Sequence, residues 1–370
     1  MTIRSLLLTT LLVPLGIAAM LLGGCGEDSM LSPSKEVGTE ASGAITNHYA
    51  HHGKIVIANR GSGTISVLEA RSGDLIGTYD LPADPNPAEP MYVVYVRRTN
   101  GVVVGDRAND QVVEFDADDF SVRRTAPTGR GVFHMWVDPV HNRQLWVNND
   151  IDNTTTVIDP VTFDVLATVE MPADLVAMGG KPHDVILNPL GRDAYVSMVG
   201  FAGANDYVIH YSTRTFDELH RAAVGKDPHL SLTQRNRRLY VPCQESDVVL
   251  VFNRTNLSPV TEIPLPGAHG VGMTRSGRIL YTTNLTGGGT DGLYAIDTRQ
   301  NQVVGDPVDT PYGVPHNIAV TSNGRRLFVT HSGPTADKVS FYSISPAQPA
   351  PVLMGEVTVG TNPFGLAYVP

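Results

Sequence analysis

The sequence predicts an all-β fold, a seven-bladed β-propeller whose four-stranded antiparallel blades form a closed ring. Three observations predict it. Of the 370 residues, 36 are Gly and 26 are Pro while only 17% are charged, which is typical of many short strands joined by turns. A short motif recurs seven times at separations of 40 to 49 residues, close to the period of a four-stranded blade. The repeat region also begins with a strand of the second type and ends with one of the innermost type.

Each repeat begins with a motif that opens an alternating apolar run, the pattern of a strand. A turn such as residues 274–277 follows, and a second strand then ends in a Tyr-Val-Thr-Asn-like tetrapeptide, as at residues 281–284. A third strand, such as residues 293–297, and a fourth, such as residues 165–169, complete the unit. The anchor residues that open the seven innermost strands are Met91, His134, His183, His229, His269, His316 and Phe364.

The propeller is expected to extend from residue 53 to residue 370. Its first strand, residues 54–59, has the pattern of a second strand of a blade, and its last, residues 363–369, has that of an innermost strand. The C-terminal strand therefore completes the first blade and closes the ring. Closure removes the exposed sheet edges that promote aggregation.

Residues 1–24 have the features of a signal peptide. Arg4 precedes an apolar run from Leu6 to Leu22, and the segment from Leu22 to Cys25 reads Leu-Gly-Gly-Cys, which resembles a bacterial lipobox. We expect Cys25 to be lipidated, and a plain secretory signal is the alternative. Residues 25–52 are rich in Ser, Pro, Gly and Glu, as in a flexible tether.

These features predict a lipoprotein of the bacterial cell envelope that faces the periplasm. Its only contact with the membrane would be the lipid anchor, because acyl chains hold a protein stably without a membrane-spanning segment. Gly26, rather than Asp, follows Cys25 and favours the outer membrane over the inner one.

Five of the seven anchor residues are His, in a chain with only 12 His. Because the anchor opens the innermost strand, these side chains should lie at one mouth of the central channel. Gly-rich loops at residues 199–205, 285–291 and 332–337 belong to the same face, and long loops on a rigid scaffold often carry function. The last residues of the second strands return to this face and read Asn59, Asp106, Asn149, Met198, Cys243, Asn284 and His331.

Neutral imidazoles beside sulfur ligands suit copper or zinc. Calcium would require more carboxylates than the few near the ring, Asp106, Asp184 and Asp227. Three further His before the first strand, His48, His51 and His52, form a candidate secondary site for metal capture. The candidate ligands of the main site are His134, His183, His229, His269, His316, His331, Cys243, Met91 and Met198.

The Tyr-Val-Thr-Asn-like tetrapeptides at residues 195–198, 240–243 and 281–284 resemble those of the YVTN-type seven-bladed propeller family, over residues 53–370. Similar propeller domains occur in nitrous oxide reductase and cytochrome cd1 nitrite reductase. The resemblance implies a propeller and, for a copper or haem site, only a general location at the channel mouth.

Three hypotheses for function follow, and whether the protein is an enzyme stays open. The first is a metal-binding or delivery protein that uses the histidine ring. The second is an enzyme or assembly factor that binds a haem-type tetrapyrrole or a small organic molecule, with a ring His as axial ligand or acid/base group. The third is an interaction scaffold with a structural histidine ring and a protein partner on the long-loop face.

Several function classes are excluded by sequence. The net charge of -10 argues against nucleic-acid binding, which normally requires a basic surface. There is neither a Gly-x-Ser-x-Gly nucleophile motif nor a Gly-x-x-x-x-Gly-Lys phosphate loop. The sequence therefore identifies no catalytic residue.

Overall fold

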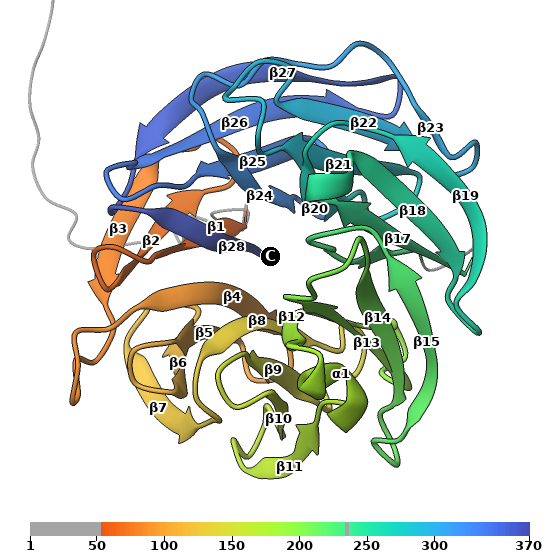
Figure 1. Cartoon of the computed structure of the whole chain (residues 1–370). Coiled ribbons are helices and arrows are strands. Elements are labelled where there is room, and N and C mark those ends of the chain that lie inside the picture. Colours follow the sequence, from red (N-terminus) through yellow and green to blue (C-terminus); the bar gives the residue numbers. More distant parts are fainter. Residues whose placement is uncertain (1–52, 234–236) are drawn as a thin grey trace, which may run out of the picture. The chain divides into compact units, whose positions relative to one another are not determined.

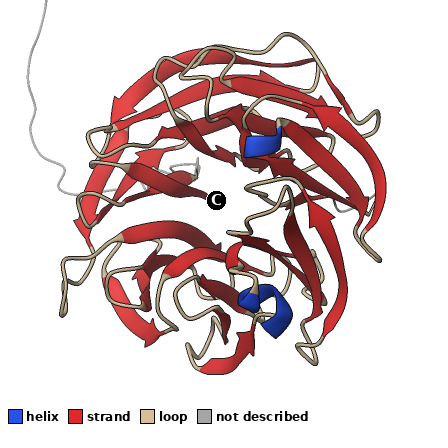
Figure 2. Ribbon diagram, in the orientation of Figure 1, coloured by secondary structure: helices blue, strands red, loops and turns tan. Residues whose placement is uncertain are grey.

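The computed structural model describes residues 53–233 and 237–370, and these form seven four-stranded antiparallel sheets. The sheets are arranged as blades around a central channel, with their innermost strands directed to its axis (Figure 1). The predicted seven-bladed fold is confirmed. Within the described residues, helix is limited to α1 (Ala173–Ala177) and the short 3₁₀ helix η1 (Gln244–Ser246), as Figure 2 shows. The predictions for residues 1–52 lie outside the described residues.

The blades are numbered along the chain, and each is given from its innermost strand outward. Blade 1 contains β28 (Pro363–Val369), β1 (Lys54–Asn59), β2 (Thr64–Glu69) and β3 (Leu75–Asp80). Blade 2 contains β4 (Pro90–Val96), β5 (Gly101–Asp106), β6 (Gln111–Asp116) and β7 (Val122–Pro127). Blade 3 contains β8 (Val132–Val137), β9 (Leu145–Asn149), β10 (Thr154–Ile158) and β11 (Val165–Glu170).

The remaining blades follow the same order. Blade 4 contains β12 (Lys181–Leu187), β13 (Asp193–Val199), β14 (Asp206–Ser212) and β15 (Glu218–Val224). Blade 5 contains β16 (Ser231–Leu232), β17 (Arg238–Cys243), β18 (Val248–Asn253) and β19 (Ser258–Pro264). Blade 6 contains β20 (Ala268–Met273), β21 (Ile279–Asn284), β22 (Leu293–Asp297) and β23 (Gln302–Val303). Blade 7 contains β24 (Pro315–Val320), β25 (Arg326–His331), β26 (Lys338–Ser345) and β27 (Gln348–Thr358).

The ring is closed by pairing between the two ends of the propeller. β28 runs antiparallel to β1, with Val369 opposite Lys54 and Leu366 opposite Ile57. This confirms that the C-terminal strand completes the first blade.

The apolar core lies between blades. One cluster combines Val56 and Ile65 of blade 1 with Val102 and Phe115 of blade 2, and all four side chains are fully buried. Burying such a side chain contributes about 1.5–3 kcal/mol. The alternating apolar residues therefore hold neighbouring blades together and keep the innermost strands in fixed positions.

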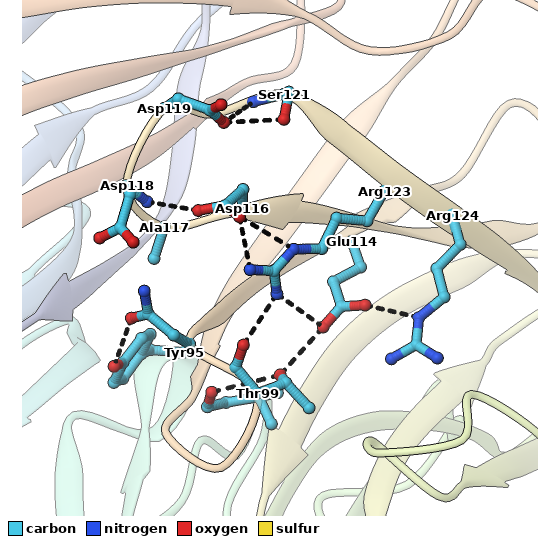
Figure 3. Close-up of polar contacts among 12 residues, drawn as sticks. Tyr95, Thr99, Glu114, Asp116, Ala117, Asp118, Asp119, Ser121, Arg123 and Arg124 are labelled. Atoms are coloured by element: carbon cyan, nitrogen blue, oxygen red, sulfur yellow. Dashed lines mark hydrogen bonds and ion pairs between the residues drawn. The ribbon is translucent and has the colours of Figure 1, made fainter.

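A polar network around Glu114 and Arg124 in blade 2 (Figure 3) also reaches blade 3. The carboxylate of Glu114 on β6 is buried and accepts hydrogen bonds from Thr99 Oγ1 at 2.9 Å and from Arg124 Nε at 2.6 Å. Arg124 also donates to the carbonyl oxygens of Val161 and Thr162 in blade 3, both at 3.0 Å. The guanidinium of Arg124 thus pairs with a buried carboxylate and links two blades.

No helix in the part of the chain that the structure describes is long and apolar enough to span a membrane.

Candidate metal centre

The register of the innermost strands determines which side chains enter the channel. Pro182, Pro228, Ala268 and Pro315 lie opposite equivalent residues at the ends of the neighbouring second strands, which are Met198, Cys243, Asn284 and His331. The residues that follow them, His183, His229, His269 and His316, therefore occupy one equivalent position. In blades 4, 6 and 7 regular pairing is interrupted directly after this point, which leaves these residues outside the ladder of hydrogen bonds.

His134 does not share that position, so this part of the sequence prediction is wrong. In blade 3, Val132 lies opposite Asn149, and the equivalent of His183 is therefore Phe133. His134 is one residue further along β8. It still reaches the channel because the pairing of β8 with β9 is also interrupted between Val132 and Met135.

Seven aromatic rings form a closed circuit in the channel, referred to below as the aromatic circuit. Neighbouring ring centres are 3.8 to 5.5 Å apart. The five predicted ring histidines are thus brought together, each within van der Waals reach of the next. The members, in order, are Tyr92, His134, His183, His229, His269, His316 and Phe364.

Asp184 fixes the orientation of His134. Its Oδ1 lies 2.9 Å from Nδ1 of His134, close enough to accept a hydrogen bond. The same carboxylate accepts backbone N–H groups from Val185 and Leu230, both at 2.7 Å. Because Nδ1 of His134 is directed to Asp184, its Nε2 is the ring nitrogen left for another partner. That Nε2 is buried and has no hydrogen-bond partner among the described residues.

His183, His229 and Asp227 bring donor atoms close together, with Oδ2 of Asp227 4.0 Å from Nε2 of His229. The two Nε2 atoms of His183 and His229 are 3.3 Å apart, and Oδ1 of Asp227 is 3.4 Å from Nε2 of His183. Ligands at 2.0–2.1 Å from a tetrahedral zinc ion are separated by about 3.3–3.4 Å. These two separations therefore match two edges of a tetrahedral coordination sphere.

Two overlapping groups of donors surround His229. His134, His183 and His229 offer one ligand atom each within 4.8 Å of one another, and so do Asp227, His229 and His269. Both ring nitrogens of His269 are buried without a hydrogen-bond partner among the described residues. A buried imidazole has lost its hydrogen bonds with water, so an unpaired ring nitrogen needs an explanation. Ligating nitrogens of a metal site have no partner when the metal is absent.

The protonation states favour metal binding. Burial, followed by the charges of neighbouring imidazoles, lowers the pKa of His183 to about 3 and the pKa values of His229 and His316 well below their ordinary range. Burial opposes ionisation of Asp184, but His134 and other contacts hold the pKa of its carboxyl below the ordinary value. The neighbouring His269 and His183 likewise lower the pKa of Asp227 against the effect of burial. At neutral pH these groups are neutral imidazoles and ionised carboxylates, the forms that bind metals.

The predicted sulfur ligands lie in the core. Met91 is fully buried in the apolar cluster between blades 2 and 3, and Met198 packs with Trp146 between blades 3 and 4. Cys243 is buried with Val241 and Leu239, and burial raises the pKa of its thiol to about 12. The structure thus gives each sulfur atom apolar neighbours and does not group it with the imidazoles.

His331 has its own partners. Its Nε2 lies 2.8 Å from Ser340 Oγ and its Nδ1 lies 3.2 Å from the carbonyl oxygen of Gly313. Asn59 makes the equivalent contact in blade 1, where its Nδ2 donates to Ser66 Oγ at 2.9 Å. His331 therefore replaces an asparagine that links the second and third strands. Burial lowers the pKa of its imidazole to about 4.

Tyr92 is a member of the aromatic circuit that the sequence analysis missed. Pro90 lies opposite Asp106, so Met91 occupies the position of His183 and Tyr92 the position of His134. Aligning the innermost strands by register rather than by histidine would have found it. His48, His51 and His52, the candidate secondary capture site, lie outside the described residues.

Comparison with known proteins agrees with this architecture. Residues 25–266 match the family described as Lactonase, 7-bladed beta-propeller. The chain belongs to this family. Among proteins with curated descriptions, none matches the chain.

Solved structures share the fold at low sequence identity. The periplasmic gluconolactonase PpgL of Pseudomonas aeruginosa is 16% identical with a TM-score of 0.65, over 86% of this chain and 99% of the other. A putative 6-phosphogluconolactonase of Bacteroides uniformis is 15% identical with a TM-score of 0.63, over 86% and 100%. Kuenenia stuttgartiensis hydrazine synthase is 13% identical with a TM-score of 0.63, over 79% and 96%. At these identities the similarity concerns the fold alone.

Proposed function

We propose that the protein binds a transition metal ion, zinc or copper, in the channel. His134, His183 and His229 supply the imidazole ligands, and Asp227 lies beside them as a further ligand or as a partner for a bound water. Asp184 orients His134 from behind, as carboxylates commonly do for metal-ligating histidines. His269 and His316 extend the cluster of imidazoles.

The observation that carries this proposal is the 3.3 Å separation between the Nε2 atoms of His183 and His229. Without a metal, one of these two atoms can donate to the other, but the arrangement still leaves Nε2 of His134 and both nitrogens of His269 unpaired in a buried environment. A metal ion satisfies several of these lone pairs at once.

The donor set favours zinc or copper(II) over copper(I). Imidazole and carboxylate ligands suit both divalent ions, whereas copper(I) prefers the thiolate and thioether ligands that pack here in the core. With three protein imidazoles, a zinc ion would keep a position for an exogenous ligand.

The N-terminal sequence supports a role in the cell envelope. The lipobox-like Leu22–Cys25 segment and the following tether lead us to propose a lipoprotein anchored by Cys25 and facing the periplasm. A rigid propeller with a preformed set of imidazoles suits a protein that holds metal or delivers it.

Metal content of the purified full chain tests the proposal. Inductively coupled plasma mass spectrometry should give close to one zinc or copper per chain for the wild type. A His183→Ala/His229→Ala variant should lose the metal. The matched control is His220→Ala, because His220 is exposed on β15. A metal-free wild type that takes up no zinc or copper on reconstitution would contradict the proposal.

Lactone hydrolysis is the second candidate function, and family membership favours it. A water molecule held at the metal beside Asp227 would be placed to attack a ring carbonyl. Glucono-1,5-lactone hydrolysis by zinc-loaded wild type, absent in the His183→Ala/His229→Ala variant, is the expected result.

A tetrapyrrole gains no comparable support, because the rings of the aromatic circuit pack against one another and leave no wide gap between neighbours.

A further inference from the structure

The ends of the blades opposite the aromatic circuit carry an uneven distribution of charge. Each innermost strand begins near the circuit and each second strand returns to it, so the turns after the first and third strands lie at the other end of the blades. In blades 5, 6, 7 and 1 these turns are rich in arginine. Their exposed arginines, referred to below as the basic face, are Arg71, Arg237, Arg275, Arg278, Arg299 and Arg325.

Few carboxylates oppose this positive charge. Among the described residues of these four blades, the side-chain carboxylates at this end are Glu69, Asp74 and Asp297. Asp297 is buried and its Oδ2 pairs with Arg278 Nε at 3.4 Å. The carboxylate of Glu69 accepts backbone N–H groups of the turn that follows it. Within the described ranges, no carboxylate pairs with Arg237, Arg275, Arg299 or Arg325.

The other three blades differ at the same end. Blades 2, 3 and 4 also have exposed arginines there, but exposed carboxylates lie in their turns between the third and fourth strands. These carboxylates belong to Asp118, Asp119, Asp164 and Asp217. The excess of positive charge is therefore confined to one side of the propeller, although the net charge of the whole chain is -10.

The chain enters the propeller beside the basic face. The carbonyl oxygen of Gly53, the first described residue, accepts a hydrogen bond at 3.1 Å from the backbone N–H of Ala70, the residue before Arg71. Blade 7 contacts the same turn, because Arg326 Nε donates to the carbonyl oxygen of Arg71 at 3.3 Å. Residues 25–52, the predicted tether, are therefore joined to the propeller on its basic side.

Two exposed apolar side chains follow the turn of Arg71. Leu75 and Ile76 open β3 and are 45% and 50% exposed. Cationic side chains beside exposed apolar ones suit the surface of an anionic bilayer, which offers negative head groups above an apolar layer.

We propose that the basic face docks on a membrane surface that contains anionic phospholipids. The inference goes beyond the proposed metal centre, and it rests on the proposed lipid anchor at Cys25 only for bringing the membrane within reach. Docking in this orientation turns the aromatic circuit away from the bilayer. The channel mouth with its imidazoles then stays open to the periplasm.

A dye at position 76 reports contact with lipid, and position 151 is the matched control. Ile151 is 54% exposed and follows β9, at the end of blade 3 that carries the aromatic circuit. Full-length Ile76→Cys and Ile151→Cys chains are labelled with a thiol-reactive dye whose emission shifts to the blue in apolar surroundings. Labelled wild type gives the background from Cys25 and Cys243. Each chain is reconstituted on phosphatidylcholine vesicles with and without phosphatidylglycerol, at low and high salt.

Two triple variants, made in the Ile76→Cys chain, test the role of charge. The first removes three charges of the basic face without breaking an ion pair between described residues, and it is Arg275→Gln/Arg299→Gln/Arg325→Gln. The control removes three exposed arginines at the same end of blades 3 and 4, and it is Arg143→Gln/Arg192→Gln/Arg214→Gln. The net charge changes equally in both. Metal content is measured for every chain.

We expect a blue shift at position 76 on vesicles with phosphatidylglycerol at low salt, and none at position 151. The shift should shrink at high salt and be absent on phosphatidylcholine alone, because salt screens exposed charges. The ratio of docked to undocked chains should fall about 100-fold in the basic-face variant and less than about 3-fold in the control. Metal content should be unchanged in both variants.

Equal shifts on the two kinds of vesicle, or equal losses in the two triple variants, would overturn docking on anionic lipid. A shift at position 76 that needs no vesicles and grows with protein concentration would overturn it as well, and would assign the basic face to a second copy of the chain. Flotation with phosphatidylcholine vesicles reports the lipid anchor separately. A chain that fails to float with them but shifts on phosphatidylglycerol would refute the anchor and support the docking face.

Discussion

The carboxylate of Asp184 lies 2.9 Å from His134 Nδ1, across the boundary between blades 3 and 4. Because it also accepts the backbone N–H of Leu230 in blade 5, this carboxylate connects three blades at the metal centre. The arrangement leaves His134 Nε2 on the side of the ring away from Asp184, and the His134 ring lies beside those of His183 and His229. Asp184 therefore decides whether His134 can act as a ligand.

Asp184→Asn should weaken zinc binding by about 10- to 100-fold, because loss of a carboxylate partner typically has this effect on a ligating histidine. A competition titration with a zinc chelator measures it. The matched control is Asp193→Asn, since Asp193 contacts His210 at 3.1 Å in a histidine–carboxylate pair that belongs to neither donor group around His229. Equal zinc affinities for the Asp184 and Asp193 variants would exclude the orienting role.

The fold was predictable because it depends on repetition. Seven similar motifs, one per blade, each with an alternating apolar pattern, are enough to define the blades and the closing strand. The repeat also placed His183, His229, His269 and His316 correctly at the start of the innermost strands, because register follows from the same pattern.

The site was less predictable because the deciding features are single-residue offsets and partners from different blades. The offset of His134 relative to Phe133 depends on the register of β8, in which Val132 lies opposite Asn149, and the motif does not reveal this register. The repeat position alone could not show that Met198 and Cys243 face the core between blades, since a residue at a strand end can turn either way. Asp184 and Asp227 were visible as nearby carboxylates, but their roles depend on contacts made across blade boundaries.

Removal of sulfur should leave metal binding intact. Met198→Leu and Cys243→Ala change buried core positions, and we expect each variant to retain the wild-type metal content. The unfolding free energy should fall by below about 1.5 kcal/mol in Met198→Leu and by about 1–3 kcal/mol in Cys243→Ala. Asp227→Asn, by contrast, should lower zinc affinity because it removes the negative charge beside His183. Metal analysis and urea unfolding separate the two classes. Metal loss in Cys243→Ala without unfolding would return the thiol to the ligand set.

Acid should destabilise the metal-free protein, partly through His331. Its imidazole has a pKa of about 4 in the folded state, below the 6.5 of the unfolded chain, so the unfolded state binds the proton first. The stability that depends on neutral His331 is complete above pH 6.5 and is lost as the pH falls toward 4, by about 2–3 kcal/mol at pH 4.5.

His331→Asn removes the imidazole that titrates between pH 6.5 and 4. The new asparagine can link the second and third strands as Asn59 does in blade 1. Its unfolding free energy should be within about 1 kcal/mol of wild type at pH 7.5 and should fall less than that of wild type at pH 4.5. Exposed His220→Asn is the control, and urea unfolding at the two pH values is the measurement. Parallel losses in wild type and His331→Asn would rule out the contribution of His331.

The Glu114–Arg124 pair should stabilise the junction of blades 2 and 3 (Figure 3). Arg124→Met leaves the buried Glu114 carboxylate with only Thr99 and the more distant Arg123 at 3.7 Å, and leaves the carbonyl oxygens of Val161 and Thr162 without that donor. We expect a loss of about 2–3 kcal/mol in unfolding free energy, as for other hydrogen bonds to a buried charge.

Arg221→Met is the comparison for that loss, since Arg221 pairs with Glu218 and Asp174 at the surface. Because water already solvates such an exposed pair, its removal should cost below about 1 kcal/mol. Urea unfolding of the two variants against wild type gives both values, and metal content should be unchanged in each because neither arginine reaches the channel. If the two losses are equal, the blade 2–3 network contributes no more than an ordinary surface ion pair, and the junction depends on its apolar cluster alone.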